Sequence, residues 1–410
     1  SGLIVAGVFP TPVGIADVIS FTTHKTMAGP RGAVLMTTDP KLGKQLDRAV
    51  FPGEQGGPHV NAIAGMAVAF KLAATEQFHA LQRQTVRNAQ QLATSLAARG
   101  IRIPHGGTDT HLLVADCKSV TAEDGTPLSG DLAARILDLA GIVCNRNTIP
   151  GDTSAFRATG LRFGTPWITQ RGFREPDVER LANIIADVLL ACRPYSYLGS
   201  GGKETLRAKL DYDTLAAARR EVDHLATVAG LDYDLPDLAR YPKEAEAAAE
   251  HFRVPPADSA LPQDGWRTLD IYGPQAREFL HFALTSDVLS LETGEYQPTW
   301  ALWPDGTPIT YGVVHRLHTG TYLLHVPRQA AQLAMWLQAL SDGFVIFDPT
   351  DIYGRMPGPV SVGLSADAPD LNAYALDFDE DWADDDTGYQ PAKAYFVGGY
   401  GPNYTGPRPE

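Results

Sequence analysis

Cysteine and long apolar runs are both scarce in this sequence. Three cysteines occur, Cys117, Cys144 and Cys192, and none belongs to a Cys-x-x-Cys pair or lies near histidines at metal-ligand spacing. The sequence therefore predicts neither a disulfide-stapled module nor a metal site, and we interpret the cysteines as buried thiols in a reducing compartment. The apolar run at residues 184–191 is interrupted by Asp187 and is far shorter than the ~20 residues of a membrane helix. We therefore expect a cytoplasmic protein with no membrane partner.

Positive charge is also in deficit. Lysine and arginine number 34 against 48 aspartates and glutamates, which gives a formal net charge of −14. This balance argues against a general affinity for nucleic acid or anionic lipid. Seven of the acids lie within residues 377–386, at spacings that fit no calcium loop, so we interpret that stretch as solvated chain rather than a cation site.

The length of the chain predicts two or three domains of ~150 residues each. Short apolar runs at residues 3–8, 17–23 and 33–37, separated by glycine and proline, are typical of strands buried on both faces of a covered α/β sheet. Helical spacing predicts two long helices over residues 59–99, broken near 75–79. The second α/β segment that follows has five expected parts: strands at 111–115 and 142–144, a helix at 132–140 capped by Ser129 or Asp131, an irregular stretch at 145–171, and a helix at 176–192.

The composition changes in the later half of the chain. Residues 200–202 have the composition of a linker, and 203–252 that of a charged, Ala-rich helical region. Five of the six tryptophans lie at or beyond Trp266, which predicts a separate core. An α+β domain is expected there, with strands at 266–271, 311–316 and 322–326 and helices at 274–284 and 328–340. The last forty residues show no periodicity, and we assign them no structure.

Lys25 is the first candidate for chemistry. It ends an apolar run and follows Thr23 and His24, a place where we expect its ammonium group to be partly desolvated. Desolvation lowers the pKa of a lysine, and the neutral amine condenses with an aldehyde to a Schiff base. Taken alone, the residue is better explained as a lysine of a surface loop. Gly56 and Gly57, just before a helix, could let backbone N–H groups approach a phosphate, although the motif alone favours a plain turn before the helix.

Arg162 is the second candidate, in a strand-like run between Gly160 and Gly164. Its planar guanidinium could hold a carboxylate with two parallel hydrogen bonds, or form a structural ion pair with one of the many acids. The histidines at positions 59, 111 and 315 stand alone, and we interpret them as core or surface residues.

Taken in order, these motifs resemble serine hydroxymethyltransferase over residues 1 to about 197. The segments that carry the resemblance are Thr-Thr-His-Lys-Thr with Gly-Pro-Arg-Gly, Pro-Gly-x-Gln-Gly-Gly-Pro, Gly-Gly-Thr-Asp-Thr-His-Leu-Leu, Cys-Asn-Arg-Asn, and Leu-Arg-Phe-Gly-Thr-Pro-Trp. The resemblance implies the α/β fold type I of pyridoxal-phosphate-dependent transferases. Residues 1–80 would be part of the large, cofactor-binding domain, and 81–197 the small α/β domain.

The resemblance also implies roles for single residues. Lys25 would hold pyridoxal phosphate as an internal aldimine, with Thr23 and His24 as its cofactor-side, catalytic neighbours. Arg31 would be an active-site residue of the same loop. Gly56 and Gly57 would reach the cofactor phosphate of the other subunit in a homodimer. The substrate side would consist of Arg162 for the amino-acid carboxylate and Asn147 near the folate pterin.

The implied reaction interconverts serine and glycine in one-carbon metabolism, with tetrahydrofolate accepting the one-carbon unit. Members of the family carry an aspartate for the pyridine nitrogen, a stacking aromatic residue and a catalytic glutamate, all at positions that precede the one matched by Ser1. We therefore expect this chain to contain the later half of such an active site.

Residues 266–360 more loosely resemble the aminomethyltransferase, or T-protein, of the glycine cleavage system. The resemblance rests on Leu-Asp-Ile-Tyr-Gly-Pro, Leu-Thr-Ser-Asp-Val, Gly-Glu-Tyr-Gln and Asp-Gly before a strand. Thr310 and Tyr311 stand where that family has acids, so we interpret 261–365 as a folate-binding or scaffold domain, after a helical linker at 198–260 and before an acidic tail at 366–410. Two alternatives remain: an active aminomethyltransferase with a vestigial first half, and a non-catalytic folate- or partner-binding fusion protein.

Overall fold

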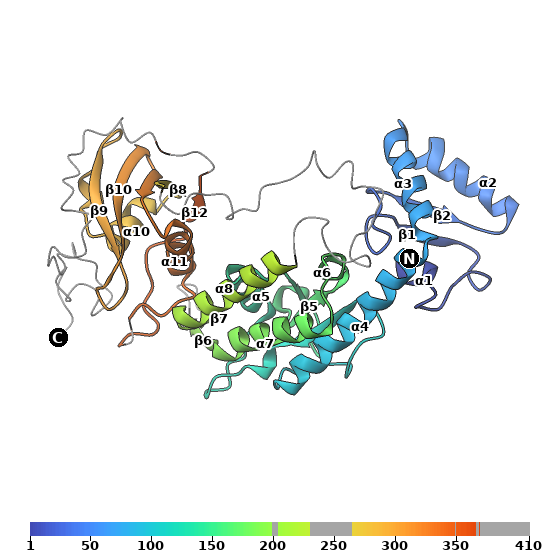
Figure 1. Cartoon of the computed structure of the whole chain (residues 1–410), viewed down its shortest axis with the longest axis horizontal. Helices are drawn as coiled ribbons and strands as arrows, with labels where there is room; N and C mark the ends of the chain where they lie inside the picture. The colour runs from blue at the N-terminus through green and yellow to red at the C-terminus, as the bar shows by residue number, and fades with distance from the viewer. Residues whose placement is uncertain (199–203, 230–264, 349, 366–368, 370–410) are drawn as a thin grey trace. The chain divides into compact units, whose positions relative to one another are not determined.

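A computed structural model of the chain describes residues 1–198, 204–229, 265–348, 350–365 and 369 (Figure 1). These residues fall into two compact units. In described residues, unit 1 comprises 1–121, 127–190 and 220–229, and unit 2 comprises 122–126, 191–198, 204–219 and the residues from 265 on. Each unit is described by itself. None of the described helices is long and apolar enough to cross a membrane.

Unit 1 begins with short elements. They are α1 (Gly2–Val5), β1 (Ile19–Thr22), β2 (Ala33–Met36), α2 (Pro40–Arg48), the irregular helical segment η1 (Ala49–Glu54) and α3 (Val60–Ala73). The predicted strand at 3–8 is wrong, because Leu3 and Ala6 are buried one helical turn apart and Gly7, at φ +69°, ends the turn. The predicted sheet buried on both faces is also wrong. β1 and β2 form a two-stranded antiparallel sheet whose residues are all exposed or half-buried.

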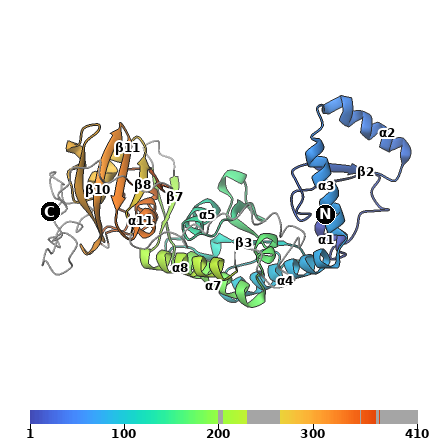
Figure 2. The same cartoon turned by 45° about the horizontal axis from the view of Figure 1, so that its top comes forward.

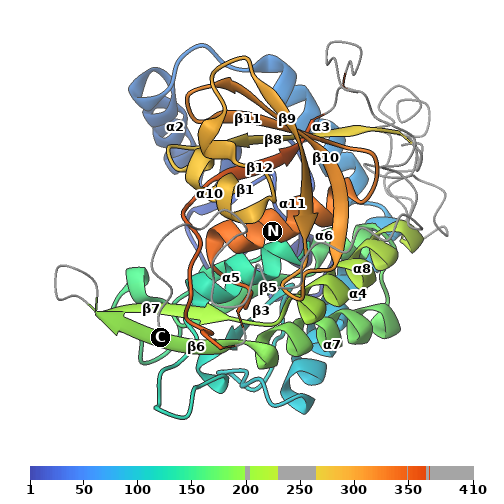
Figure 3. The same cartoon turned by 90° about the vertical axis from the view of Figure 1, so that its left-hand side faces the viewer.

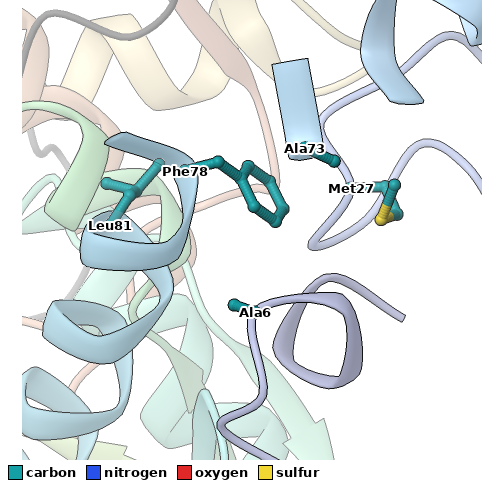
Figure 4. Packing of buried hydrophobic residues seen from close by; sticks show 5 residues of the cluster. All are labelled: Ala6, Met27, Ala73, Phe78 and Leu81. Carbon is teal, nitrogen blue, oxygen red and sulfur yellow. The ribbon is translucent and has the colours of Figure 1, made fainter. Parts of the chain in front are cut away.

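The two long helices predicted over 59–99 are confirmed as α3 and α4 (Glu76–Ala98). Thr75 separates them, and its hydroxyl caps α4 by accepting the N–H of Phe78 at 3.3 Å. The ring of Phe78 projects toward Ala73, Met27 and Ala6, and together with Leu81 these residues form a buried cluster (Figure 4). The cluster joins α1, the segment after β1, α3 and α4, so it fixes the segment that carries Lys25.

The rest of unit 1 contains a three-stranded antiparallel sheet in the order β3-β5-β4, with helices beside it (Figure 2). The elements are β3 (Leu112–Asp116), η2 (Cys117–Ser119), α5 (Gly130–Leu139), β4 (Asn145–Asn147), η3 (Ala155–Arg157), β5 (Gly160–Gly164), α6 (Pro166–Gln170) and α7 (Glu175–Ala191). Ser129 caps α5 as predicted, with its hydroxyl accepting the N–H of Leu132 at 3.3 Å.

Two predictions in this region are wrong. Residues 142–144 are not a strand, because Gly141 at φ +84° ends α5 and the N–H of Ile142 donates back to the carbonyl of Leu137. Residues 145–171 are not irregular, since they include β4, β5 and α6. β5 requires Gly160 at its start, because a Cβ there would lie 2.4 Å from Cγ2 of Ile149.

Unit 2 is built on a mostly antiparallel sheet. Its five strands lie in the order β12-β8-β11-β10-β9, and β9, β10, β11 and β8 lie side by side in Figure 3. The elements are β6 (Arg193–Leu198), β7 (Glu204–Lys209), β8 (Arg267–Tyr272), α10 (Ala276–Ala283), η5 (Val288–Ser290), β9 (Tyr296–Leu302), β10 (Pro308–His318), β11 (Thr321–Val326), α11 (Ala330–Asp342) and β12 (Ser361–Leu364). Phe279, Tyr322 and Trp336 are among its largest fully buried side chains.

The α+β character predicted for this part is confirmed, with two strands more than expected. β9 contains Pro298, and a proline in a sequence normally argues against a strand. β9 is an edge strand, however, where proline is tolerated. The helical prediction for 203–252 is wrong at Glu204–Lys209, which pairs with β6 as β7, and correct for α8 (Tyr212–Val228). The predicted linker at 200–202, the remainder of the helical region at 230–252 and the tail at 370–410 lie outside the described residues.

Candidate active site

A cavity of about 390 Å³ lies beside Lys25 in unit 1. It is open on one side, and β1, the loop after it and the residue before β3 form its walls. Its lining residues are Ser1, Ser20, Phe21, Thr22, Lys25, Thr26, Ala33 and His111. The cavity therefore combines one amine, one imidazole and several hydroxyl groups with the apolar surface of Phe21 and Ala33.

The loop that carries Lys25 is held by hydrogen bonds at both of its ends. Thr23 is fully buried, and its hydroxyl donates to the carbonyl of Pro30 at 2.6 Å. The hydroxyl of Thr26 accepts the N–H of Gly2 at 2.9 Å, and the Thr26 carbonyl accepts from Nε2 of Gln82 at 3.1 Å. Thr23 thus stabilises the backbone of its own loop, and Lys25 projects from a fixed turn.

Lys25 and His24 are both exposed. The sequence predicts partial desolvation of the Lys25 amine. The described residues do not provide it, because the side chain is exposed. The consequence for chemistry is accessibility: the Lys25 amine can be reached by a reagent from solvent.

His111 is a wall residue of the cavity, although its sequence context alone predicts only a core or surface histidine. Its carbonyl accepts from the N–H of Thr165 at 3.0 Å and from the Thr165 hydroxyl at 3.2 Å. Burial lowers the pKa of His111, and the positive charges of Lys25 and Arg162 lower it further. Its Nδ1 is buried and has no hydrogen-bond partner within the part of the chain that the structure describes.

Arg162 lies on the exposed face of β5, between the buried side chains of Leu161 and Phe163. Its Nη2 donates to Oδ1 of Asn145 on β4 at 3.3 Å. No carboxylate of the described residues is within ion-pair distance of it, so the alternative of a structural ion pair finds no support there. The positive charge of Arg162 contributes to the lowered pKa of His111, which lines the Lys25 cavity.

Lys25 is the one predicted site residue that lines the cavity, and the others do not: Thr23, His24, Arg31, Gly56, Gly57, Asn147 and Arg162. Asn147 is half-buried on β4, and its Nδ2 donates to the carbonyl of Thr148 at 2.8 Å. Arg31 is exposed in the loop before β2. Gly56 and Gly57 are exposed before α3, and a Cβ at either would meet nothing within 4 Å. Their backbone is therefore accessible to a ligand or to another chain.

The cysteines and acids form no metal site among the residues described. Cys117 and Cys192 are buried, as predicted, whereas Cys144 is only half-buried. Burial raises the pKa of Cys144 and of Cys192 to about 12, so both stay protonated at neutral pH.

Comparison with known proteins relates the first part of the chain to one family. Residues 1–185 match the model of the serine hydroxymethyltransferase family. The hydroxymethyltransferase of Synechococcus sp. (strain JA-3-3Ab) is 46% identical over 196 residues, which are 46% of this chain and 45% of that protein. That of Nitrosomonas europaea is 47% identical over 190 residues, or 46% and 44% of the two chains.

The chain thus spans about half the length of the curated relatives that it matches. The similarity to serine hydroxymethyltransferases extends to about residue 190 and does not include the antiparallel sheet of unit 2. The fusion to a T-protein domain is not shown by these matches.

Proposed function

We propose that residues 1 to about 190 bind pyridoxal phosphate at Lys25 and an amino acid beside it, and contribute these sites to a serine hydroxymethyltransferase reaction. The observation that carries the proposal is the cavity of about 390 Å³ that contains Lys25 in a segment with the sequence of that family. The substrates would be serine or glycine and tetrahydrofolate, in one-carbon metabolism.

The residues present fit the cofactor in part. An accessible amine at the wall of a cavity suits covalent attachment of an aldehyde. The imidazole of His111 adds a second polar group to the wall beside the amine. Pyridoxal phosphate, when bound, supplies the electron-withdrawing ring that lets the bond to the hydroxymethyl group of serine break.

The surrounding residues would position the reactants. Thr23 holds the loop from within, and His24 stands beside the amine on the exposed side. Arg162 would bind the substrate carboxylate, with Asn145 aligning its guanidinium. Asn147 on the neighbouring strand would lie near the folate, and Arg31 would contribute positive charge from the loop. Gly56 and Gly57 would offer backbone N–H groups to the cofactor phosphate of a second subunit.

Residues 261–365 remain a proposed folate-related domain. Thr310 is fully buried, and the ring of Tyr311 lies 5.8 Å from that of Trp266 and 5.6 Å from that of Trp300. Because neither position offers a carboxylate, a binding or scaffold role is better supported than aminomethyl transfer.

Borohydride trapping tests the proposal. The 410-residue chain, incubated with pyridoxal phosphate, is expected to turn yellow, to bleach on reduction, and to carry the reduced adduct on the Lys25 peptide by mass spectrometry. Lys25→Ala is expected to abolish the adduct. Lys44→Ala, which removes an exposed lysine of α2 outside the cavity, provides the matched control and is expected to retain it.

An adduct on another lysine, or equal uptake by the Lys25→Ala variant, would contradict the proposal. A wild-type chain that stays colourless would favour the alternative of a non-catalytic folate- or partner-binding protein.

A further inference from the structure

His111 has the position of a substrate-binding residue. It is the one wall residue of the Lys25 cavity that comes from the β3 side, and its backbone is fixed by Thr165. The Thr165 hydroxyl also donates to the carbonyl of Thr85 on α4 at 2.7 Å. Thr165 directly follows β5, so the imidazole and Arg162 are positioned by the same stretch of chain.

The buried nitrogen of His111 indicates which ring nitrogen carries the proton. Nδ1 is buried without a partner in the described chain, whereas Nε2 is not both buried and unpartnered. A neutral imidazole has a single N–H. A proton on Nδ1 would be a buried donor with no acceptor, so the Nε2–H tautomer is favoured, and Nε2 is then the hydrogen-bond donor of the ring.

The charges around the ring indicate which ligand group it meets. The side chains that act on the ring electrostatically are both cationic: Lys25 and Arg162. Within the described residues, no aspartate or glutamate pairs with Lys25, His111 or Arg162. Because burial and these cations lower its pKa, His111 is an uncharged donor at neutral pH in a cavity that favours an anion.

We infer that the Nε2–H of His111 donates a hydrogen bond to the carboxylate of the amino-acid substrate, next to Arg162. The inference rests on the proposed function, because it takes the ligand to be serine or glycine bound beside Lys25. It adds a binding residue from a second segment of the cavity wall and names the substrate group that this residue contacts.

Binding measurements on the cofactor-loaded chain test this inference. His111→Ala is expected to weaken the binding of glycine and of serine by about tenfold, the effect of one hydrogen bond to a charged group. His111→Gln, whose amide can donate from a similar position, is expected to restore most of the affinity. His105→Ala, which removes an exposed histidine outside the cavity, is expected to match the wild type. Glycinamide, which lacks the carboxylate, is expected to bind the wild type and His111→Ala equally.

Nitrogen-15 NMR of the wild type gives an independent readout that does not depend on how the variants fold. The Nε2–H tautomer of His111 is expected before glycine is added, and the Nε2 resonance is expected to move when glycine binds.

The outcomes separate the two proposals. If the wild type takes up no pyridoxal phosphate, the proposed function fails. If it takes up the cofactor but binds no glycine, the amino-acid site of the proposed function fails as well. If it binds both, and His111→Ala binds glycine as tightly as the wild type, only the inference about His111 is overturned. Loss of serine affinity alone would assign His111 to the hydroxyl group and would likewise overturn the carboxylate contact.

Discussion

Single residues of the Lys25 loop divide into those that hold the backbone and those whose side chains are exposed. The hydroxyls of Thr23 and Thr26 are engaged with backbone groups, and both side chains are buried. Lys25 and His24 are exposed. Substitution of Thr23 therefore acts on Lys25 through the position of the loop, whereas substitution of Lys25 removes the reactive group itself.

His325 makes the stability of unit 2 dependent on pH. It is buried on β11, where its Nδ1 lies 2.9 Å from Oγ1 of Thr268, and burial, with a further contribution from His315, lowers its pKa to about 4. Between pH 6.5 and 4 the unfolded chain binds a proton that the folded chain does not. The free energy of unfolding is therefore expected to fall by about 2 kcal/mol between pH 6.5 and 4.5.

Denaturant unfolding followed by tryptophan fluorescence measures this change. In a Trp167→Phe background all remaining tryptophans lie at or beyond position 266 and report on the later half of the chain. His325→Gln, which keeps a polar partner for Thr268, is expected to lose most of the pH dependence in this range. An unchanged slope in that variant would contradict the assignment.

Among the elements, the long helices could be predicted and the short ones could not. α4 and α7 each run for several turns, so their apolar periodicity is unambiguous. The run at residues 3–8 is too short for period 2 and period 3.6 to be told apart. What decides its helical form is the burial of Leu3 and Ala6 and the turn at Gly7, and the burial depends on the packing of distant segments.

The candidate site shows the same limit. Lys25 and Arg162 could be found because each lies in a motif with several fixed neighbours. His111 lies in such a motif too, but an isolated histidine carries no signal of its own, and its distance in sequence from Lys25 hides their shared cavity. Only the packing of the two segments brings the imidazole to the amine.

β7 is attached to the segment after α11 by a buried lysine. The Lys209 amine donates to the carbonyl of Gly354 and lies 5.4 Å from the ring centre of Phe347. Burial lowers its pKa to about 8, a change that Asp351 and Asp348 oppose and Arg355 reinforces. Between pH 8 and 10.5 the unfolded chain keeps a proton that the folded chain has lost, so stability rises with pH there.

The free energy of unfolding is accordingly expected to increase by about 1.5 kcal/mol from pH 8 to 9.5. Lys209→Met retains the length of the side chain and removes the titrating group, and its unfolding should be nearly independent of pH over that interval. The Trp167→Phe background serves again for the measurement. A variant with the wild-type increase would show that another group causes it.

At the scale of the whole molecule, the first part of unit 1 has more apolar surface than it buries. In α3 only Asn61 and Lys71 are polar, and a helix that is apolar on all sides is normally buried. Yet only Ala69 and Ala73 of this helix are buried, and Val60 and Ile63 are exposed by 68% and 55%. Such a surface is typical of an interface with another chain, which agrees with the proposed homodimer.

Ile63→Glu is therefore expected to weaken self-association of the chain by at least about tenfold, because it replaces apolar contact area with a charge that must lose its water. Sedimentation velocity over a range of concentrations measures the effect. Val143→Glu is the matched control, since Val143 is 84% exposed in the same unit but lies after α5, outside the α3 surface. Equal sedimentation of the two variants would exclude α3 from the interface. A loss of cofactor uptake in Ile63→Glu alone would connect the interface to Gly56 and Gly57, since these glycines directly precede the same helix.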